Sequence, residues 1–109
     1  MSYVLSRKAE EDAIGIFQTG VEQFGLSQAE RYHEQLGQCF RFLAENPLAA
    51  HERFEILPPV RIHPIGSHLV IYRVEENGTI FIIRVRHAHE DWQSNTNTNT
   101  NTNTNTNTT

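Results

Sequence analysis

The chain has 109 residues, and the last sixteen, from Ser94 to Thr109, are almost entirely an Asn-Thr repeat. The preceding part, roughly 93 residues, suffices for one small domain with a single hydrophobic core and excludes two such domains. The formal net charge is −4 and Lys8 is the only lysine. Proteins that bind through phosphate contacts are usually basic, so we expect no direct, sequence-specific binding to DNA.

The apolar residues indicate a cytoplasmic protein without a membrane span. No run of 18 or more apolar residues occurs, which excludes a transmembrane helix. The first residues lead directly into charged positions and lack the apolar stretch of a secretory signal. Cys39, the one cysteine, cannot form an internal disulfide, and we interpret it as a small buried apolar residue.

Two helices are predicted after a short strand at Tyr3–Leu5. Ser6 is a suitable N-cap for the first helix, whose apolar residues recur at spacings of three and four up to Gly25. Acidic residues 10–12 are interpreted as its solvated start. Ser27 and Glu30 match a capping box for the second helix, which ends at Asn46-Pro47. The short connection predicts an antiparallel helical hairpin.

Three strands are predicted in the second half of the chain, at Val60–Ile65, His68–Val74 and Thr79–His87, where β-branched and aromatic residues are frequent. Asn77-Gly78 is a strong hairpin signal between the last two strands. The expected fold class is therefore α+β, with the order β-α-α-β-β-β and an antiparallel sheet packed on the helical hairpin. We assign residues 1–93 to this domain and 94–109 to a disordered tail that cannot bury a core.

The last two strands are apolar at consecutive positions, in residues 69–72 and 80–83. A sheet with one face in water should alternate instead, and two helices cover only one face. We expect Ile80 and Ile82 to lie on the second face, in line with Arg84 and Arg86. That face is covered either by the terminal segments of the chain or by a permanent protein partner.

The ordered combination of these segments resembles the RelE/ParE toxin superfamily. Residues 61–74 are similar to its second and third sheet strands. The closing segment Ile80–Trp92, with Arg84-Val85-Arg86-His87 followed by Asp91-Trp92, resembles the last strand of ParE members in particular. Leu5-Ser6, Ala9 and the Asn46-Pro47 loop are also similar to the family. The resemblance extends from Ser2 to Gln93.

The resemblance implies a toxin of a type II toxin–antitoxin system, of the kind associated with plasmid stabilisation, that a ParD-like antitoxin neutralises. ParE-type toxins are understood to inhibit DNA gyrase, whereas RelE relatives cut messenger RNA on the ribosome. RelE-type catalysis draws on Lys, Arg and a late Tyr or His. This chain has no lysine after Lys8 and no tyrosine after Tyr72, and acids Glu90 and Asp91 follow the last strand. We therefore favour a gyrase inhibitor that is not an enzyme.

Two alternatives stay open. The first is a ribosome-dependent endoribonuclease in which His87 and His89 serve as acid and base while Arg84 and Arg86 hold phosphate. The second is an inactive homologue that only binds its antitoxin, because the effect of the Asn-Thr tail on toxicity is open. Under the leading interpretation, seven residues contact the target or antitoxin: Arg73, Ile80, Ile82, Arg84, Arg86, His87 and Trp92.

Each candidate also has an ordinary structural explanation. The histidines can be hydrogen-bonded structural residues, and the arginines can be solvated or paired with acids. Tyr72 is expected in the core with its hydroxyl satisfied. Six histidines and Cys39 show no compact ligand spacing, so we expect no metal and no other cofactor.

Overall fold

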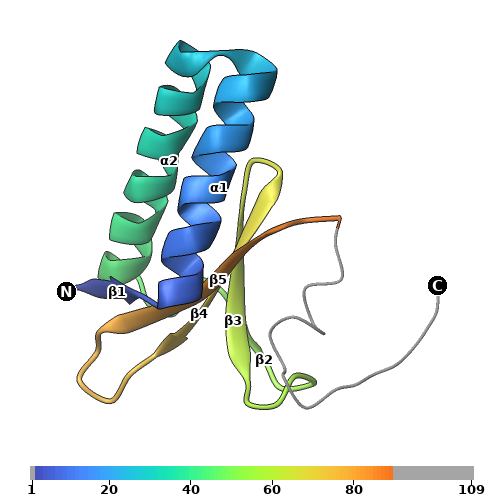
Figure 1. The fold of residues 1–109 in the computed structure, drawn as a ribbon. Coiled ribbons are helices and arrows are strands. Elements are labelled where there is room, and N and C mark those ends of the chain that lie inside the picture. Colours follow the sequence, from blue (N-terminus) through green and yellow to red (C-terminus); the bar gives the residue numbers. More distant parts are fainter. Residues whose placement is uncertain (1, 90–109) are drawn as a thin grey trace, which may run out of the picture.

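The computed structural model describes residues 2–89 as one α+β unit (Figure 1). The elements, in chain order, are β1 (Tyr3–Leu5), α1 (Arg7–Phe24), α2 (Leu26–Glu45), β2 (Glu52–Arg53), β3 (Val60–Ile65), β4 (His68–Val74) and β5 (Ile80–His87). The predicted β-α-α-β-β-β order is confirmed, with β2 as a two-residue addition. The division into a domain over 1–93 and a tail over 94–109 stays a prediction, because the tail lies outside the described residues.

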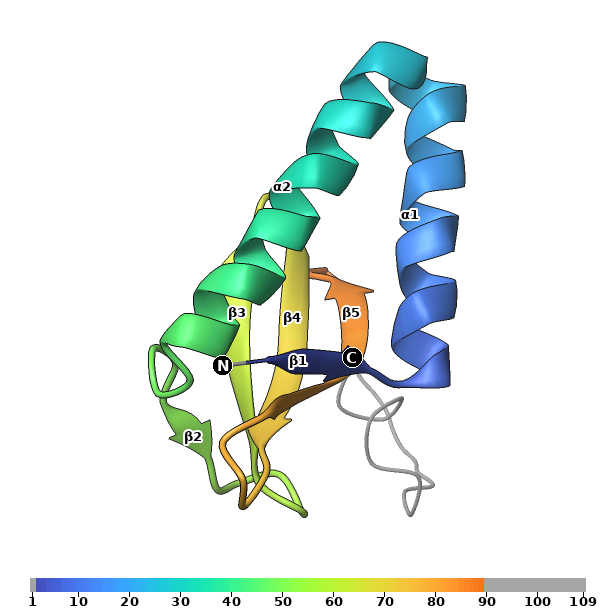
Figure 2. The ribbon, with the colours of Figure 1, turned by 90° about the vertical axis from the view of Figure 1, so that its left-hand side faces the viewer.

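The five strands form one sheet in the order β1-β5-β4-β3-β2, with both helices on one side of it (Figures 1 and 2). All neighbouring strands are antiparallel except β1 and β5, which run parallel. The sheet is therefore mixed rather than wholly antiparallel. The helical hairpin carries the chain from β1 at one edge of the sheet to β2 at the other edge. The strands β3, β4 and β5 then return across the sheet, so that β5 lies beside β1.

Gly25 connects the two helices and is the C-cap of α1 as well as the N-cap of α2. Its φ of 89° is a conformation that suits glycine, and its N–H donates to the Val21 carbonyl at 3.0 Å. The predicted capping box at Ser27 and Glu30 is wrong. Because Gly25 is the N-cap of α2, Ser27 lies within the first turn of the helix, and no side chain caps α2.

The main core lies between the sheet and the helices. It contains Leu36 and Leu43 of α2 together with Val70, Tyr72 and Val85 of the sheet. Tyr72 is fully buried, and its hydroxyl donates to the Pro47 carbonyl at 2.8 Å, as predicted. Burial raises the pKa of the Cys39 thiol, also part of this core, to about 11.

The expectation that Ile80 and Ile82 lie on the second face of the sheet is wrong. Both are fully buried in the main core beneath the helices. The second face has its own small cluster of Ile56, Val60 and Ile71. Ile56 comes from the segment between β2 and β3, so a loop from the middle of the chain covers this part of the sheet. The centre of β4 has apolar side chains on both faces, because the helices bury one face and the loop that contains Ile56 buries the other.

A register shift between β4 and β5 determines which residues of β5 face the helices. Tyr72 pairs with Ile82 and Ile71 pairs with Arg84, so Ile83 has no direct partner on β4. Such an extra residue is a β-bulge, which interrupts the alternation of side chains along the strand. Ile82 and Val85, three residues apart, consequently face the same core.

Within residues 2–89, no helix is both long enough and apolar enough to cross a lipid bilayer.

Candidate functional site

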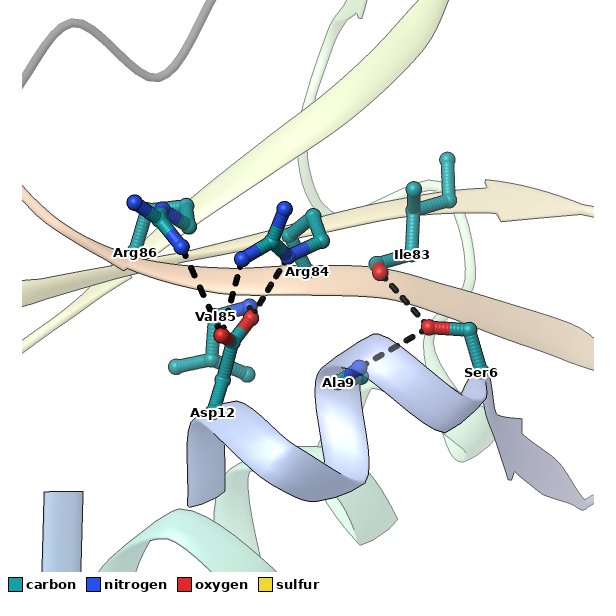
Figure 3. A network of polar contacts seen from close by, with 7 residues as sticks. All are labelled: Ser6, Ala9, Asp12, Ile83, Arg84, Val85 and Arg86. Atoms are coloured by element: carbon teal, nitrogen blue, oxygen red, sulfur yellow. Dashed lines mark hydrogen bonds and ion pairs between the residues drawn. The ribbon is translucent and has the colours of Figure 1, made fainter. Parts of the chain in front are cut away.

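The β5 arginines are organised by a carboxylate on α1 (Figure 3). Arg84 donates from Nε to Asp12 Oδ2 at 2.8 Å and from Nη2 to Asp12 Oδ1 at 2.9 Å. Arg86 Nη1 lies 3.5 Å from Asp12 Oδ1, and the Val85 N–H donates to Oδ2 at 3.0 Å. The Asp12 and Arg84 side chains are only 11% and 12% exposed. The prediction that Asp12 belongs to a solvated helix start is therefore wrong, because its side chain is largely buried against Arg84.

Ser6 makes a second attachment between α1 and β5, immediately before this network (Figure 3). Its hydroxyl accepts the Ala9 N–H at 2.9 Å, as expected of an N-cap, and donates to the Ile83 carbonyl at 2.7 Å. Its own N–H donates to the Ile82 carbonyl at 2.9 Å. The pairing of β1 with β5 ends at Leu5. Ser6, which precedes α1, then binds the next two carbonyl groups of β5, at Ile82 and Ile83.

The electrostatics of Asp12 follow from these contacts. Burial by itself would raise the pKa of the Asp12 carboxyl. The hydrogen bonds from Arg84 and Val85, together with the charges of Arg84 and Arg86, outweigh burial and hold that pKa below its ordinary value of 3.8. Asp12 is therefore ionised at neutral pH, where its carboxylate forms ion pairs with both Arg84 and Arg86.

The other strand arginines are also paired with acids. Arg73 Nε lies 2.7 Å from Glu75 Oε2, and its guanidinium lies 4.6 Å from the centre of the Phe81 ring. Arg61 Nη2 lies 3.9 Å from Glu52 Oε1. The predicted contact residues are thus separated, because Arg73 lies at the Asn77-Gly78 end of the β4–β5 hairpin. Trp92, also predicted, lies outside the described residues.

Aromatic and imidazole rings gather at the opposite end of that hairpin. His87 pairs with His68 across the strands, with ring centres 5.3 Å apart, and the His89 ring lies 5.4 Å from that of His87. The Tyr32 hydroxyl lies 3.0 Å from the Ile65 carbonyl and 2.7 Å from His68 Nδ1. The hydroxyl donates to the Ile65 carbonyl, and the tautomer of the His68 ring decides which atom is the donor in the hydrogen bond between Tyr32 and His68.

His87 and His89 were predicted from the sequence as site residues, whereas Tyr32, His68 and Asp12 were not. The hairpin predicted at Asn77-Gly78 is the signal that could have identified His68, because antiparallel pairing around this turn brings residues near 68 and 87 together. The register shift at Ile83 decides the pairing, and the sequence contains no clear signal for it. The approach of α1 to β5, which brings Asp12 to Arg84, is a tertiary contact between residues 72 positions apart.

A cleft of about 710 Å³ opens between α1, the start of α2 and this end of the hairpin. Its apolar part is formed by Ile16 and the exposed Phe24, and its strand side by His68, Arg86 and His87. Gly15 and Gly20 leave the α1 side without side chains at two positions. The volume falls in the range typical of ligand pockets.

Metal ligation is not indicated in the part of the chain that the structure describes. Within residues 2–89, no group of three or more His, Cys, Asp or Glu side chains is arranged to hold a metal ion.

A helical hairpin on a mixed five-stranded sheet, with α1 attached to the last strand, defines a RelE/ParE-like toxin fold. Residues 3–92 match the family model described as the ParE toxin of the type II toxin–antitoxin system parDE, and the chain belongs to this family. It is a ParE-type toxin, and such a system implies an antitoxin partner.

Individual relatives agree with this assignment. The chain is 34% identical to Toxin ParE1 of Mycobacterium tuberculosis over 93 residues, which cover 85% of this chain and 95% of the relative. It is 33% identical over 85 residues to Toxin ParE1 of Caulobacter vibrioides, covering 78% of this chain and 86% of the relative. A solved structure, described as the chromosomal ParDE TA system from P. aeruginosa, shares the fold with a TM-score of 0.67. That match covers 80% of this chain and 95% of the other, at 24% identity.

Proposed function

We propose that the protein inhibits DNA gyrase by binding to it in the cytoplasm, without catalysing a reaction, and that a ParD-like antitoxin neutralises it. Plasmid stabilisation is the biological role that such a pair would serve. The contact surface consists of the end of β5 and the segment after it, with Arg86, His87 and Trp92 as its principal residues. Arg84 acts mainly by fixing this part of the strand, because its side chain is only 12% exposed.

One observation carries this choice, namely the Asp12 carboxylate between the β5 arginines. An endoribonuclease must stabilise the negative charge that develops on the phosphate during cleavage. Here Arg84 already donates twice to Asp12, and Arg86 lies 3.5 Å from the same carboxylate. A phosphate at these arginines would meet a buried negative charge. A neutral or apolar protein surface meets no such repulsion, so this geometry favours a protein-binding function.

A ribonuclease is the second candidate, and the histidine cluster favours it. Tyr32, His68, His87 and His89 form a continuous series of ring contacts beside Arg86. Imidazoles are the side chains best suited to acid–base chemistry near neutral pH. A His87→Ala/His89→Ala double variant separates the two functions. Retained toxicity with an intact fold supports gyrase inhibition. Because His87 is also a proposed gyrase contact, lost toxicity supports catalysis only if the wild-type protein cleaves messenger RNA on ribosomes and the double variant does not.

The direct test is DNA supercoiling by purified gyrase, titrated with the full chain in the presence and absence of its ParD-like antitoxin. Inhibition that the antitoxin reverses supports the proposal. A folded protein that leaves supercoiling unchanged at large molar excess contradicts it. Messenger RNA cleavage on ribosomes is then measured on the same sample. Antitoxin binding without either activity would identify an inactive homologue.

A further inference from the structure

Helix α1 is held in place by much less apolar burial than α2. Among the 18 residues of α1, all of which the structure describes, Ala9 alone is buried. Helix α2 buries six residues, including the large side chains of Leu36 and Leu43. Ala13 and Ile16 of α1 pack against the main core but are only partly buried. Because stabilisation grows with the apolar area that is buried, packing alone holds α1 weakly.

The second half of α1 stands away from the sheet. The cleft of about 710 Å³ separates Gly15, Thr19 and Gln23 from the end of the β4–β5 hairpin. The two helices come close near the tip of the helical hairpin, where a Cβ on Gly20 would lie 3.3 Å from the Ala29 Cβ. From the tip they diverge toward the sheet (Figure 2). The two glycines weaken α1 further, since glycine is a poor helix former.

Polar contacts attach the first half of α1 to β5 (Figure 3). The Ser6 hydroxyl donates to the Ile83 carbonyl at 2.7 Å. Asp12 accepts two hydrogen bonds from Arg84, at 2.8 and 2.9 Å, and one from the Val85 N–H at 3.0 Å. The Asp12 side chain is only 11% exposed, and hydrogen bonds to a charged group contribute more than those between neutral groups. Asp12 is therefore the main attachment of α1 to the sheet.

We propose that α1 opens as a separate unit of the domain and that Asp12 is the latch that holds it closed on β5. Elements with few buried apolar contacts open at a lower free energy than the whole domain. The core between α2 and the sheet persists in the open state, because Ala9 is the one buried residue that α1 contributes to it. Opening releases the Val85 N–H, which adjoins Arg86. The latch thus controls how firmly the end of β5 is held, whichever partner binds there.

Native-state hydrogen exchange of the full chain, measured for each amide by nuclear magnetic resonance at low urea concentrations, tests this opening. After correction for intrinsic rates, the amides of α1 should exchange at least about tenfold faster than those of α2 and β4. They should also depend less on urea, because a local opening exposes less surface. The Val85 amide is the most direct probe, since its acceptor is the Asp12 carboxylate. Its opening free energy should equal that of α1. Equal opening free energies for α1, α2 and Val85 would overturn the inference.

Two glycine variants separate local from global opening. A Cβ on Gly15 would meet nothing within 4 Å, so Gly15→Ala should slow the exchange of α1 roughly fivefold by favouring the helix. Gly37→Ala is the matched control on α2, where the nearest atom to a new Cβ is the Arg41 Nη1 at 3.5 Å. Since α2 stays folded when α1 opens, Gly37→Ala should slow the exchange of α2 and leave that of α1 unchanged. If Gly37→Ala slows both helices equally, they open together and the inference is wrong.

A third variant tests the latch itself. Asp12→Asn should speed the exchange of α1 and of the Val85 amide about thirtyfold, because it removes charge-assisted hydrogen bonds from a largely buried site. Glu22→Gln, the same kind of change at an exposed position of the same helix, should not speed it. If α1 exchanges at the same rate in Asp12→Asn and in the wild type, Asp12 is not the latch. Should Asp12→Asn fail to fold, the wild-type and glycine measurements still decide whether α1 opens separately.

Discussion

Asp12 and Arg84, 72 positions apart in the chain, join α1 to β5 through two hydrogen bonds of 2.8 and 2.9 Å. The two bonds run from one guanidinium to one carboxylate, which is the strongest arrangement available to this pair. The same carboxylate accepts the Val85 N–H. Asp12 therefore fixes both the side chains and the backbone of β5 after the register shift.

Replacing this carboxylate by a neutral amide should destabilise the fold. We expect Asp12→Asn to lower the free energy of unfolding by about 2 kcal/mol, since it removes charge-assisted hydrogen bonds from a largely buried site. Urea denaturation followed by circular dichroism measures the change. Glu34→Gln is the control, because the Arg41–Glu34 pair is 55% and 67% exposed and exposed pairs contribute about 0–1 kcal/mol. Equal effects of the two substitutions would contradict the structural role of Asp12.

The stability contributed by Asp12 should depend on pH in a defined direction. The pKa of Asp12 is lower in the folded protein than its ordinary value of 3.8. The contribution is therefore fully present above about pH 5 and is lost as the pH falls through the folded pKa. The difference in unfolding free energy between wild type and Asp12→Asn should be constant from neutral pH down to about pH 5, and it should shrink at lower pH. If this difference grows as the pH falls, the pKa of Asp12 is not lowered in the folded protein.

Gly66, in the turn between β3 and β4, should not tolerate a side chain. Its φ is +55°, and an added Cβ would lie 2.6 Å from the Tyr32 Oη and 2.7 Å from its Cε1. We expect Gly66→Ala to cost about 2 kcal/mol through backbone strain and displacement of the Tyr32 ring. Equilibrium unfolding measures this cost, and nuclear magnetic resonance of the His68 ring reports the loss of its bond to Tyr32. Gly37→Ala, in open helix surroundings, should instead be neutral or stabilising.

Cys39 should react slowly with alkylating reagents until the protein unfolds. Burial raises the pKa of its thiol from 9.0 to about 11, and only the thiolate reacts. At pH 8 the thiolate fraction should be roughly 100-fold lower than for a free cysteine. Mass spectrometry after iodoacetamide treatment, with and without urea, tests this. Rapid modification of the folded protein would contradict the burial of Cys39.

The order and type of the secondary elements could be predicted from local chemistry. Ser6 is an N-cap, Gly25 ends α1, and the strands β3 and β4 have the predicted bounds. These features depend on residues close together in the sequence, such as a hydroxyl that accepts an N–H three residues later. The family resemblance likewise came from ordered local segments.

The site depended on contacts that local patterns do not encode. The prediction for Ile80 and Ile82 failed because it required knowing which face of β5 meets the helices. The register shift at Ile83 then changes that relationship along the strand. Asp12 looked like a helix-start acid because only the approach of α1 to β5 gives it two arginine partners.

The sequence by itself thus determined that this is a small α+β protein of the ParE kind, because caps, periodicity and turn residues act over a few positions. Only the tertiary structure decided where its charges and openings lie. It pairs the arginines with acids, places Ile80 and Ile82 in the core, and leaves a cleft beside Gly15. The reason is physical, because burial and ion pairing depend on distances in space, and one bulge or one helix position changes these for residues far apart in the chain.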